Sequence, residues 1–158
     1  MSDLRPARAG ASATPAAPAA QAELALPRPP ASRRARVLVV DDESMVCAAI
    51  RRTLESEHEV VTTSDPRSAL QRLSGGECYD VVLCDLLMPQ LTGMECFDAL
   101  SRERPEMARR MVFLTGGAFT PGARKFIDDH RTRCIEKPFD PDELRARVAE
   151  AADRLARA

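Results

Sequence analysis

Residues 80–93 read DVVLCDLLMPQLTG, and this stretch sets the pattern for the chain. The run at 81–84 is apolar at every position, which is typical of a strand that is covered on both faces of a sheet. The run ends at Asp85, and Thr92 and Glu95 then form the Thr-x-x-Glu pattern that caps the start of a helix. A buried strand that is soon followed by a helix predicts one βα unit of a parallel sheet.

Similar units extend outward from this stretch in both directions. Pro follows Asp or Thr at 65–66, 120–121 and 140–141, where it predicts the first turn of a helix, and Gly75-Gly76 predicts a helix end. Strand and helix thus alternate five times, which predicts a doubly wound α/β fold, a five-stranded parallel sheet with helices on both faces. The further strands are expected at 37–40, 59–63, 110–115 and 134–135, and the helices at 43–57, 66–73, 93–103, after Thr120 and at 141–155.

Composition divides the chain into a tail at 1–35 and one folded domain at 36–156. The tail holds six of the twelve prolines, and proline breaks the helices that its many alanines favour. We therefore expect an Ala/Pro-rich, disordered tail; a transit peptide is the alternative, but Asp3, Glu23 and the prolines count against it. The formal net charge of -1 gives no indication of nucleic acid or a membrane as a direct partner.

The cysteines and histidines indicate neither disulfides nor a zinc site. The five cysteines include no Cys-x-x-Cys pair, and the two histidines are isolated. Buried thiols in a reducing compartment are expected instead. No stretch approaches the ~20 apolar residues of a membrane span, and the first residues form no apolar signal segment. We therefore expect a cytoplasmic protein.

Polar residues stand at the ends of four predicted strands. Because the carboxyl ends of parallel strands meet at one edge of a sheet, these side chains are expected to converge there. Taken singly, each has a structural explanation, such as a helix cap, a turn or a solvated surface position. The residues are Asp41 and Asp42 after the first strand, Asp85 after the third, Thr115 at the end of the fourth and Lys137-Pro138 after the fifth.

These residue types suit phosphoryl transfer to a carboxylate. Three carboxylates at close range repel one another, so a cation is needed to keep them ionised. Oxygen ligands without a neighbouring His or Cys favour Mg²⁺ over zinc. A lysine supplies positive charge, and a threonine hydroxyl donates to an anionic oxygen. We therefore expect Mg²⁺ as the cofactor and a carboxylate as the phosphoryl acceptor.

Four strings resemble the response-regulator receiver family in order and spacing, across about residues 36–156. They are VLVVDDE (37–43), LCDLLMPQLTG (83–93), FLTGG (113–117) and EKPF (136–139). The resemblance implies a flavodoxin-like receiver that accepts a phosphoryl group from a histidine kinase or a histidine phosphotransfer protein and signals to a downstream effector protein by a conformational switch. It implies no enzyme activity beyond self-catalysed transfer and slow autodephosphorylation. The segment LTGGAFTPGAR (114–124) is similar to receivers of hybrid sensor histidine kinases.

The resemblance assigns roles to the acidic residues and their neighbour. Asp85 matches the phosphorylated aspartate, which is also a metal ligand. Asp42 matches a direct Mg²⁺ ligand, and Asp41 matches one that acts mainly through a metal-bound water. The backbone carbonyl of Leu87 matches the remaining protein ligand.

The resemblance also covers the surroundings of the phosphoryl group. Thr115 matches the hydroxyl that moves toward that group, and Lys137 matches the cation that pairs with it. The Lys137-Pro138 peptide is expected to be cis, although trans is the default even before proline. Gly116 leaves the acceptor open to a donor histidine; alternatively, it only gives the loop conformational freedom.

The chain departs from the family at three positions. Cys134 stands where many receivers have Tyr or Phe, whose rotation accompanies the threonine movement. The switch is therefore expected to be read through the loop and helix at Phe119–Asp129. Leu87 and Gly117 stand where polar side chains in the family orient a hydrolytic water, so we expect no such assistance here.

Three other functions remain open on the sequence. A degenerate receiver would act only as a protein-binding module, although the site residues are all present. An aspartate-nucleophile phosphatase would need a second Asp two residues after its nucleophile, where this chain has Leu87. A flavin or nucleotide binder of the same fold is disfavoured because no Gly-rich phosphate loop follows the first strand.

Overall fold

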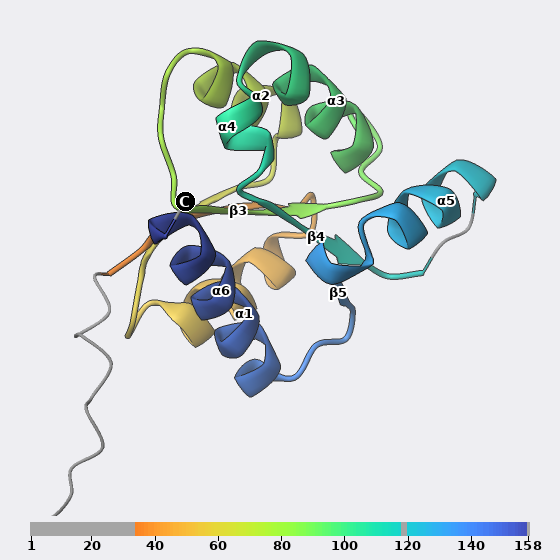
Figure 1. Cartoon of the computed structure of the whole chain (residues 1–158). Coiled ribbons are helices and arrows are strands. Elements are labelled where there is room, and N and C mark those ends of the chain that lie inside the picture. Colours follow the sequence, from red (N-terminus) through yellow and green to blue (C-terminus); the bar gives the residue numbers. More distant parts are fainter. Residues whose placement is uncertain (1–33, 118–119, 158) are drawn as a thin grey trace, which may run out of the picture. The chain divides into compact units, whose positions relative to one another are not determined.

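The computed structural model describes residues 34–117 and 120–157, which form alternating strands and helices (Figure 1). The strands are β1 (Arg36–Val40), β2 (Glu59–Thr63), β3 (Val81–Asp85), β4 (Met111–Thr115) and β5 (Cys134–Glu136). The helices are α1 (Ser44–Leu54), α2 (Pro66–Ser74), α3 (Gly93–Glu103), α4 (Pro105–Ala108), α5 (Pro121–Asp129) and α6 (Pro141–Ala156). All strands pair in parallel in the order β2-β1-β3-β4-β5, so the predicted doubly wound α/β fold is confirmed.

The sheet separates two apolar layers because alternate residues of each strand point to opposite faces. Leu38 and Val40 of β1 belong to the layer that contains buried residues of α2, α3, α4 and α5. Val37 and Val39 belong to the layer that contains buried residues of α1 and α6. Figure 1 shows the two helix layers on either side of the sheet. Burial on both faces explains why β1, β3 and β4 read as continuous apolar runs.

Capping side chains fix the starts of four helices at the carboxyl edge of the sheet. The predicted capping box is present before α3: Thr92 Oγ1 accepts from the Glu95 N–H at 3.1 Å, and Glu95 Oε2 accepts from the Thr92 N–H at 2.8 Å. Asp65, Thr120 and Asp140 cap α2, α5 and α6, each followed by Pro. Each cap satisfies backbone N–H groups that the helix leaves free, which contributes about 1 kcal/mol.

Some element boundaries differ from the prediction. Helix α1 ends at Leu54 rather than at residue 57: the Glu57 N–H donates to the Leu54 carbonyl at 3.0 Å, a tighter i+3 bond that closes the last turn before β2. Helix α4 lies between two predicted elements, where the sequence predicts no helix. It forms because Pro105 ends α3 and is well suited to the first position of a new helix. A single helical turn at Arg131–Arg133 precedes β5.

The predicted tail lies almost wholly outside the described residues. Its last two positions are described: Ala35 is buried, and Arg34 Nη2 donates to the Glu55 carbonyl at 2.7 Å. Phe119, at the start of the segment that is predicted to report phosphorylation, also lies outside. In the described part of the chain, no helix combines the length and apolar character needed to cross a bilayer.

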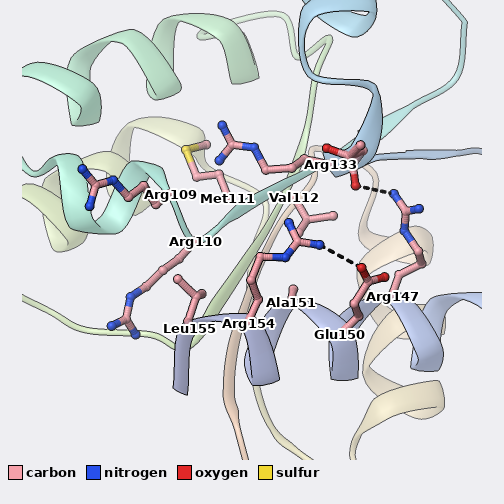
Figure 2. A pocket seen from close by; sticks show the side chains of 11 residues that line it. Arg109, Arg110, Met111, Val112, Arg133, Arg147, Glu150, Ala151, Arg154 and Leu155 are labelled. Carbon is pink, nitrogen blue, oxygen red and sulfur yellow. Dashed lines mark hydrogen bonds and ion pairs between the residues drawn. The ribbon is translucent and has the colours of Figure 1, made fainter. Parts of the chain in front are cut away.

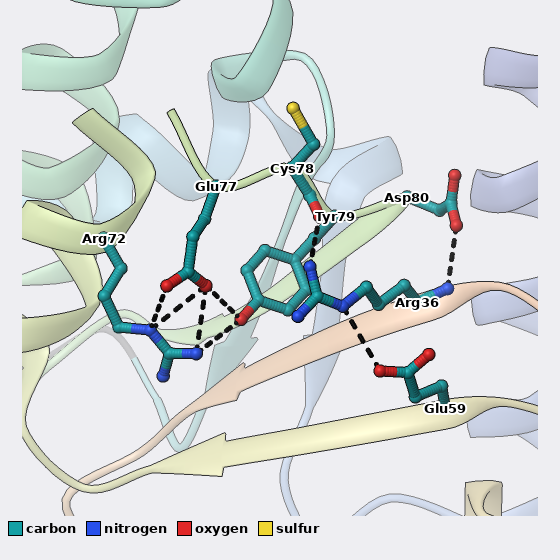
Figure 3. Close-up of polar contacts among 7 residues, drawn as sticks. All are labelled: Arg36, Glu59, Arg72, Glu77, Cys78, Tyr79 and Asp80. Atoms are coloured by element: carbon teal, nitrogen blue, oxygen red, sulfur yellow. Dashed lines mark hydrogen bonds and ion pairs between the residues drawn. The ribbon is translucent and has the colours of Figure 1, made fainter. Parts of the chain in front are cut away.

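A polar network around Tyr79 connects side chains at the amino edge of the sheet (Figure 3). The Tyr79 ring is buried, its hydroxyl donates to Glu77 Oε2 at 2.8 Å, and Arg72 Nη2 donates to the same hydroxyl at 2.8 Å. The Arg36 guanidinium lies 4.5 Å from the ring centroid, which is a cation–π contact. Burial and the bond to Glu77 raise the pKa of the Tyr79 hydroxyl. The network ties β1 to the chain that enters β3, at the end of the sheet remote from Asp85.

Candidate functional site

Three carboxylates from two strands meet at the carboxyl edge of the sheet. Asp41 and Asp42 follow β1 directly, and Asp85 is the last residue of β3, which pairs with β1. One oxygen from each carboxylate lies within 4.8 Å of the other two. Asp41 and Asp85 are buried, whereas Asp42 is exposed. The structure therefore brings these three residues together, with Asp42 on the solvent side.

The Lys137 ammonium lies among the carboxylates. Its Nζ atom is 2.7 Å from Asp41 Oδ2 and 3.4 Å from Asp85 Oδ2. Glu43 Oε1 lies 3.8 Å from the same atom. The Lys137–Pro138 peptide is cis, as predicted. Lys137 is therefore in contact with the two buried carboxylates at once.

Thr115 ends β4 next to this cluster. Leu114, the residue before it, is paired with Asp85 across the sheet. The Thr115 carbonyl accepts from the Lys137 N–H at 2.7 Å, and its Oγ1 accepts from the Gly117 N–H at 3.2 Å. Thr115 is buried, and no acceptor for its hydroxyl proton is found among residues 34–117 and 120–157. The hydroxyl therefore keeps a proton to donate to an oxygen that enters the site.

Burial dominates the electrostatics of Asp85. Desolvation raises the pKa of this carboxyl from 3.8 to about 6; the charge of Asp41 adds to the rise, while Lys137 opposes it. The Leu87 N–H, 3.4 Å from Asp85 Oδ1, also opposes the rise. Burial acts to lower the pKa of Lys137, but the contact with Asp41 and the charge of Asp85 outweigh burial and raise it.

We expect the metal-free protein to lose stability as the pH rises. The Asp85 carboxyl holds its proton to a higher pH in the folded protein than in the unfolded chain. Folding therefore takes up a proton between about pH 4 and 6, and the free energy of unfolding falls across that range. Replacing Asp85 with Asn removes this cost and should raise the free energy of unfolding at pH 7.5 by about 3 kcal/mol. Urea titrations in a chelator measure the free energy of unfolding of both proteins. If the difference between these two free energies did not grow from pH 4 to 7.5, the account would be contradicted.

The donor set fits a hard divalent cation. Asp41 Oδ2 is buried, and the Lys137 ammonium lies 2.7 Å from it. One ammonium group faces three clustered carboxylates, so negative charge remains in excess. Hard cations bind oxygen ligands of this kind. The residues that would hold the ion are Asp41, Asp42 and Asp85, together with the backbone carbonyl of Leu87 that the family resemblance implies.

Two residues have contacts at the site that the sequence does not single out. Glu43 lies within reach of Lys137, although its position indicates only a helix start. A Cβ atom at Gly93 would lie 2.5 Å from the Asp85 carbonyl oxygen, so α3 begins too close to β3 for any side chain there. The available signal is a Gly directly after a Thr cap, where a better helix former would be expected.

Gly116 and Cys134 lie in contrasting surroundings near the site. Gly116 is exposed, and within residues 34–117 and 120–157 no atom lies within 4 Å of the position that a Cβ would take. Cys134 is half-buried and packs against the apolar layer that includes Phe126. Its Sγ lies 3.4 Å from the His130 carbonyl, and burial raises the pKa of the thiol. Cys134 therefore fills space in the core.

Known proteins share both the sequence pattern and this fold. The family model of the response regulator receiver domain matches residues 37–149. The chain is 37% identical over 120 residues to the transcriptional regulatory protein TcrA of Mycobacterium tuberculosis, covering 75% of this chain and 46% of TcrA. It is 34% identical over 154 residues to the virulence sensor protein BvgS of Bordetella bronchiseptica, covering 92% of this chain and 12% of BvgS. The chain thus spans less than half the length of these relatives.

Solved structures agree with these matches. A CheY-like response regulator receiver domain protein from Methanospirillum hungatei superposes with a TM-score of 0.68 at 24% identity, covering 79% of this chain and 98% of that one. A response regulator receiver domain protein from Clostridium thermocellum superposes with a TM-score of 0.65 at 30% identity, covering 76% and 95%. Because the family model, the relatives and the fold agree, the chain belongs to the response regulator receiver family.

Proposed function

We propose that Asp85 accepts a phosphoryl group from a phosphohistidine of a histidine kinase or a histidine phosphotransfer protein. The observation that carries the proposal is the meeting of three carboxylates with Lys137 at one edge of the sheet. Burying Asp85 beside Asp41 raises its pKa to about 6, a cost that fold stability alone does not explain. A site for a cation and an incoming phosphoryl group does explain it.

In the proposed reaction, an oxygen of the Asp85 carboxylate attacks phosphorus. An O–P bond forms, the P–N bond to the donor imidazole breaks, and the electron pair of that bond stays on the imidazole nitrogen, which takes up a proton. Lys137 pairs with the phosphoryl oxygens, and the Thr115 hydroxyl donates to one of them. A bound Mg²⁺ ion would neutralise part of the charge on those oxygens. Gly116 adds no side chain beside Thr115 that would obstruct the donor ring.

We propose that α5 reports the phosphorylated state to a downstream effector protein. Attraction of Thr115 toward the phosphoryl group would move the end of β4. Phe113, two residues earlier in β4, packs on Phe126 of α5 with ring centroids 4.8 Å apart, and Phe126 packs on His130 at 4.3 Å. These ring contacts connect β4 to α5 and do not include residue 134, which is Cys here and aromatic in many receivers.

Enzymatic turnover is not part of the proposed function. The chain would catalyse only its own phosphorylation and a slow loss of the phosphoryl group. An aspartate-nucleophile phosphatase has a second acid two residues after its nucleophile, and Leu87 supplies none. We also propose that the protein acts in the cytoplasm, which fits its five free cysteines.

Leu87→Asn should shorten the lifetime of the phosphorylated protein. Leu87 is half-buried beside Asp85 and cannot orient a water, whereas an amide can hold one near the phosphorus atom. We expect dephosphorylation to become about tenfold faster, measured by intact mass after the phosphodonor is removed. Leu91→Asn, at another half-buried position in the same connection, is the control and should leave the rate unchanged. An unchanged rate in Leu87→Asn would contradict the assignment. Gly117→Glu is a poorer test, because Gly117 has φ 122, which strains any side chain.

The direct test of the proposed function is incubation with acetyl phosphate and Mg²⁺, followed by intact mass spectrometry. The proposal expects a gain of one phosphoryl group that disappears in chelator. A protein-binding module without phosphorylation would show no gain, and a phosphatase would release phosphate continuously from small esters.

A further inference from the structure

A cavity lined by arginines lies at the amino edge of the sheet, where β4 begins beside the second half of α6 (Figure 2). This is the opposite end of β4 from Thr115 and the acidic cluster. The charged residues that line it are Arg109, Arg110, Arg133, Arg147, Arg154 and Glu150, and we call this group the arginine cavity. Segments that are distant in sequence therefore contribute five arginine side chains to the lining of one space.

Positive charge in the arginine cavity is poorly balanced. Arg154 Nη2 pairs with Glu150 Oε1 at 2.9 Å, and Arg110 Nη1 lies 3.8 Å from Asp80 Oδ1. The other three, Arg109, Arg133 and Arg147, have no carboxylate within 4 Å among the residues that the structure describes. A chain with a net charge of -1 thus gathers like charges at one place, at a cost in folding free energy.

Two of the unpaired guanidinium groups are held in fixed orientations. Arg133 Nη1 donates to the Ala108 carbonyl at 3.0 Å, and its guanidinium lies 5.2 Å from the centroid of the Phe97 ring. Arg147 Nη2 donates to the carbonyls of Thr132 and Cys134 at 2.9 and 2.8 Å. A guanidinium has five N–H donors, so each keeps donors for an external acceptor. Groups that are already fixed lose little conformational entropy when they bind.

Two further observations indicate a missing acceptor. Arg110 Nε is buried and has no hydrogen-bond partner among the described residues. Burial and the positive charge of Arg154 lower the pKa of Arg133, so its charge is not compensated by the protein around it. Figure 2 shows Arg147 and Arg154 on α6 directed toward the start of β4, with Val112 and Ala151 between them and Arg133 on the far side of the strand. An anionic group that enters the cavity would therefore meet positive charge that the described residues do not balance.

We propose that the arginine cavity binds carboxylate side chains of an acidic segment in a partner protein. The cavity volume is ≈ 20 Å³, which is small enough to admit only the tip of a side chain and too little for a nucleotide. Guanidinium groups pair with carboxylates through two parallel hydrogen bonds. Residues 37–158 carry 17 basic and 22 acidic residues, so a nucleic acid that extended beyond the cavity would meet an acidic surface. A short acidic segment senses only its surroundings within about 10 Å.

This binding is independent of the proposed phosphorylation. The arginine cavity and Asp85 lie at opposite ends of the sheet, and no lining residue of the cavity belongs to the acidic cluster. A partner docked there would stay attached in both phosphorylation states, so the cavity would anchor a partner while the Asp85 end changes. Asp85→Asn should therefore leave the binding unchanged.

Fluorescence anisotropy with a labelled, end-blocked peptide of alternating Gly and Glu tests the proposal at about 100 mM salt, where screening acts over about 10 Å. We expect saturable binding that weakens with added salt, and no binding of the matching Gly/Gln peptide. Arg109→Gln with Arg154→Gln should weaken binding at least tenfold, since each charged hydrogen bond contributes ~1.5 kcal/mol or more. Both side chains are exposed, and neither supports the backbone in the described part of the chain. The control is Arg67→Gln with Arg102→Gln, which makes the same charge change on exposed surfaces of α2 and α3.

The possible outcomes separate the proposal from its rivals. Equal losses in the two double variants would show a general charge effect and overturn it, as would no saturable binding below about 1 mM peptide. A single-stranded oligonucleotide of equal charge that binds more tightly than the peptide, and loses binding in Arg109→Gln with Arg154→Gln, would make the partner a nucleic acid and also overturn it. Urea titrations that show both double variants folded make each result interpretable.

Discussion

Asp85→Asn is expected to reduce phosphoryl uptake from acetyl phosphate to background, a loss of about a thousandfold or more. The amide oxygen carries no negative charge and is a poor nucleophile. No other carboxylate in the described cluster has the same surroundings, because Asp41 is fully buried against Lys137 and Asp42 is exposed. The measurement is the fraction of protein that gains one phosphoryl group, followed over time by intact mass.

The control for this result is Asp98→Asn, at an exposed position of α3. It makes the same chemical change outside the acidic cluster and should leave uptake unaltered. Unfolding cannot explain a loss in Asp85→Asn, because that substitution should make the metal-free protein more stable. If Asp85→Asn still gained a phosphoryl group at the original rate, the acceptor would lie elsewhere and the assignment would be wrong.

Lys137→Met is expected to have the second largest effect, on both stability and phosphorylation. The Lys137 ammonium is 16% exposed and is the cation in contact with Asp41 and Asp85 in the described cluster. Removing it leaves two buried carboxylates without a counter-charge, which should lower the free energy of unfolding by about 3 kcal/mol at pH 7.5 in a chelator. Uptake should fall about a hundredfold even where the variant is folded, because the phosphoryl oxygens lose a positive partner.

The matched control is Lys125→Met, since the chain has only these two lysines. Lys125 is 77% exposed and pairs with Asp129 on the surface of α5, so its loss should change little. Adding Asp41→Asn to Lys137→Met removes one of the unpaired charges and should recover part of the stability but not the uptake. Full uptake in Lys137→Met would show that the lysine only supports the fold.

The sequence is sufficient for the fold and for the acidic part of the site. Strands buried on both faces appear as apolar runs, and the site residues stand at or directly after their carboxyl ends, so the pairing of β1 with β3 places Asp85 near Asp41. The capping patterns before α2, α3, α5 and α6 are equally local, because a cap needs only neighbours in the chain. These features depend on short stretches that can be read one at a time.

Features that depend on the approach of separate segments could not be predicted. Glu43 reaches Lys137 only because β1 and β5 end at the same edge of the sheet. The need for glycine at position 93 comes from the distance between α3 and the Asp85 carbonyl, which no local pattern encodes. The arginine cavity joins the chain before β4, the turn before β5 and the end of α6, each of which looks like ordinary charged surface in the sequence.

The most direct test of the account is to locate the phosphoryl group itself. The protein would be treated with acetyl phosphate and Mg²⁺, reduced with borohydride, and digested for tandem mass spectrometry. If Asp85 carries the acyl phosphate, the reduction converts that residue to homoserine, and no other aspartate is converted. Homoserine elsewhere, or a phosphoryl group that survives reduction on a serine, threonine or histidine, would contradict it.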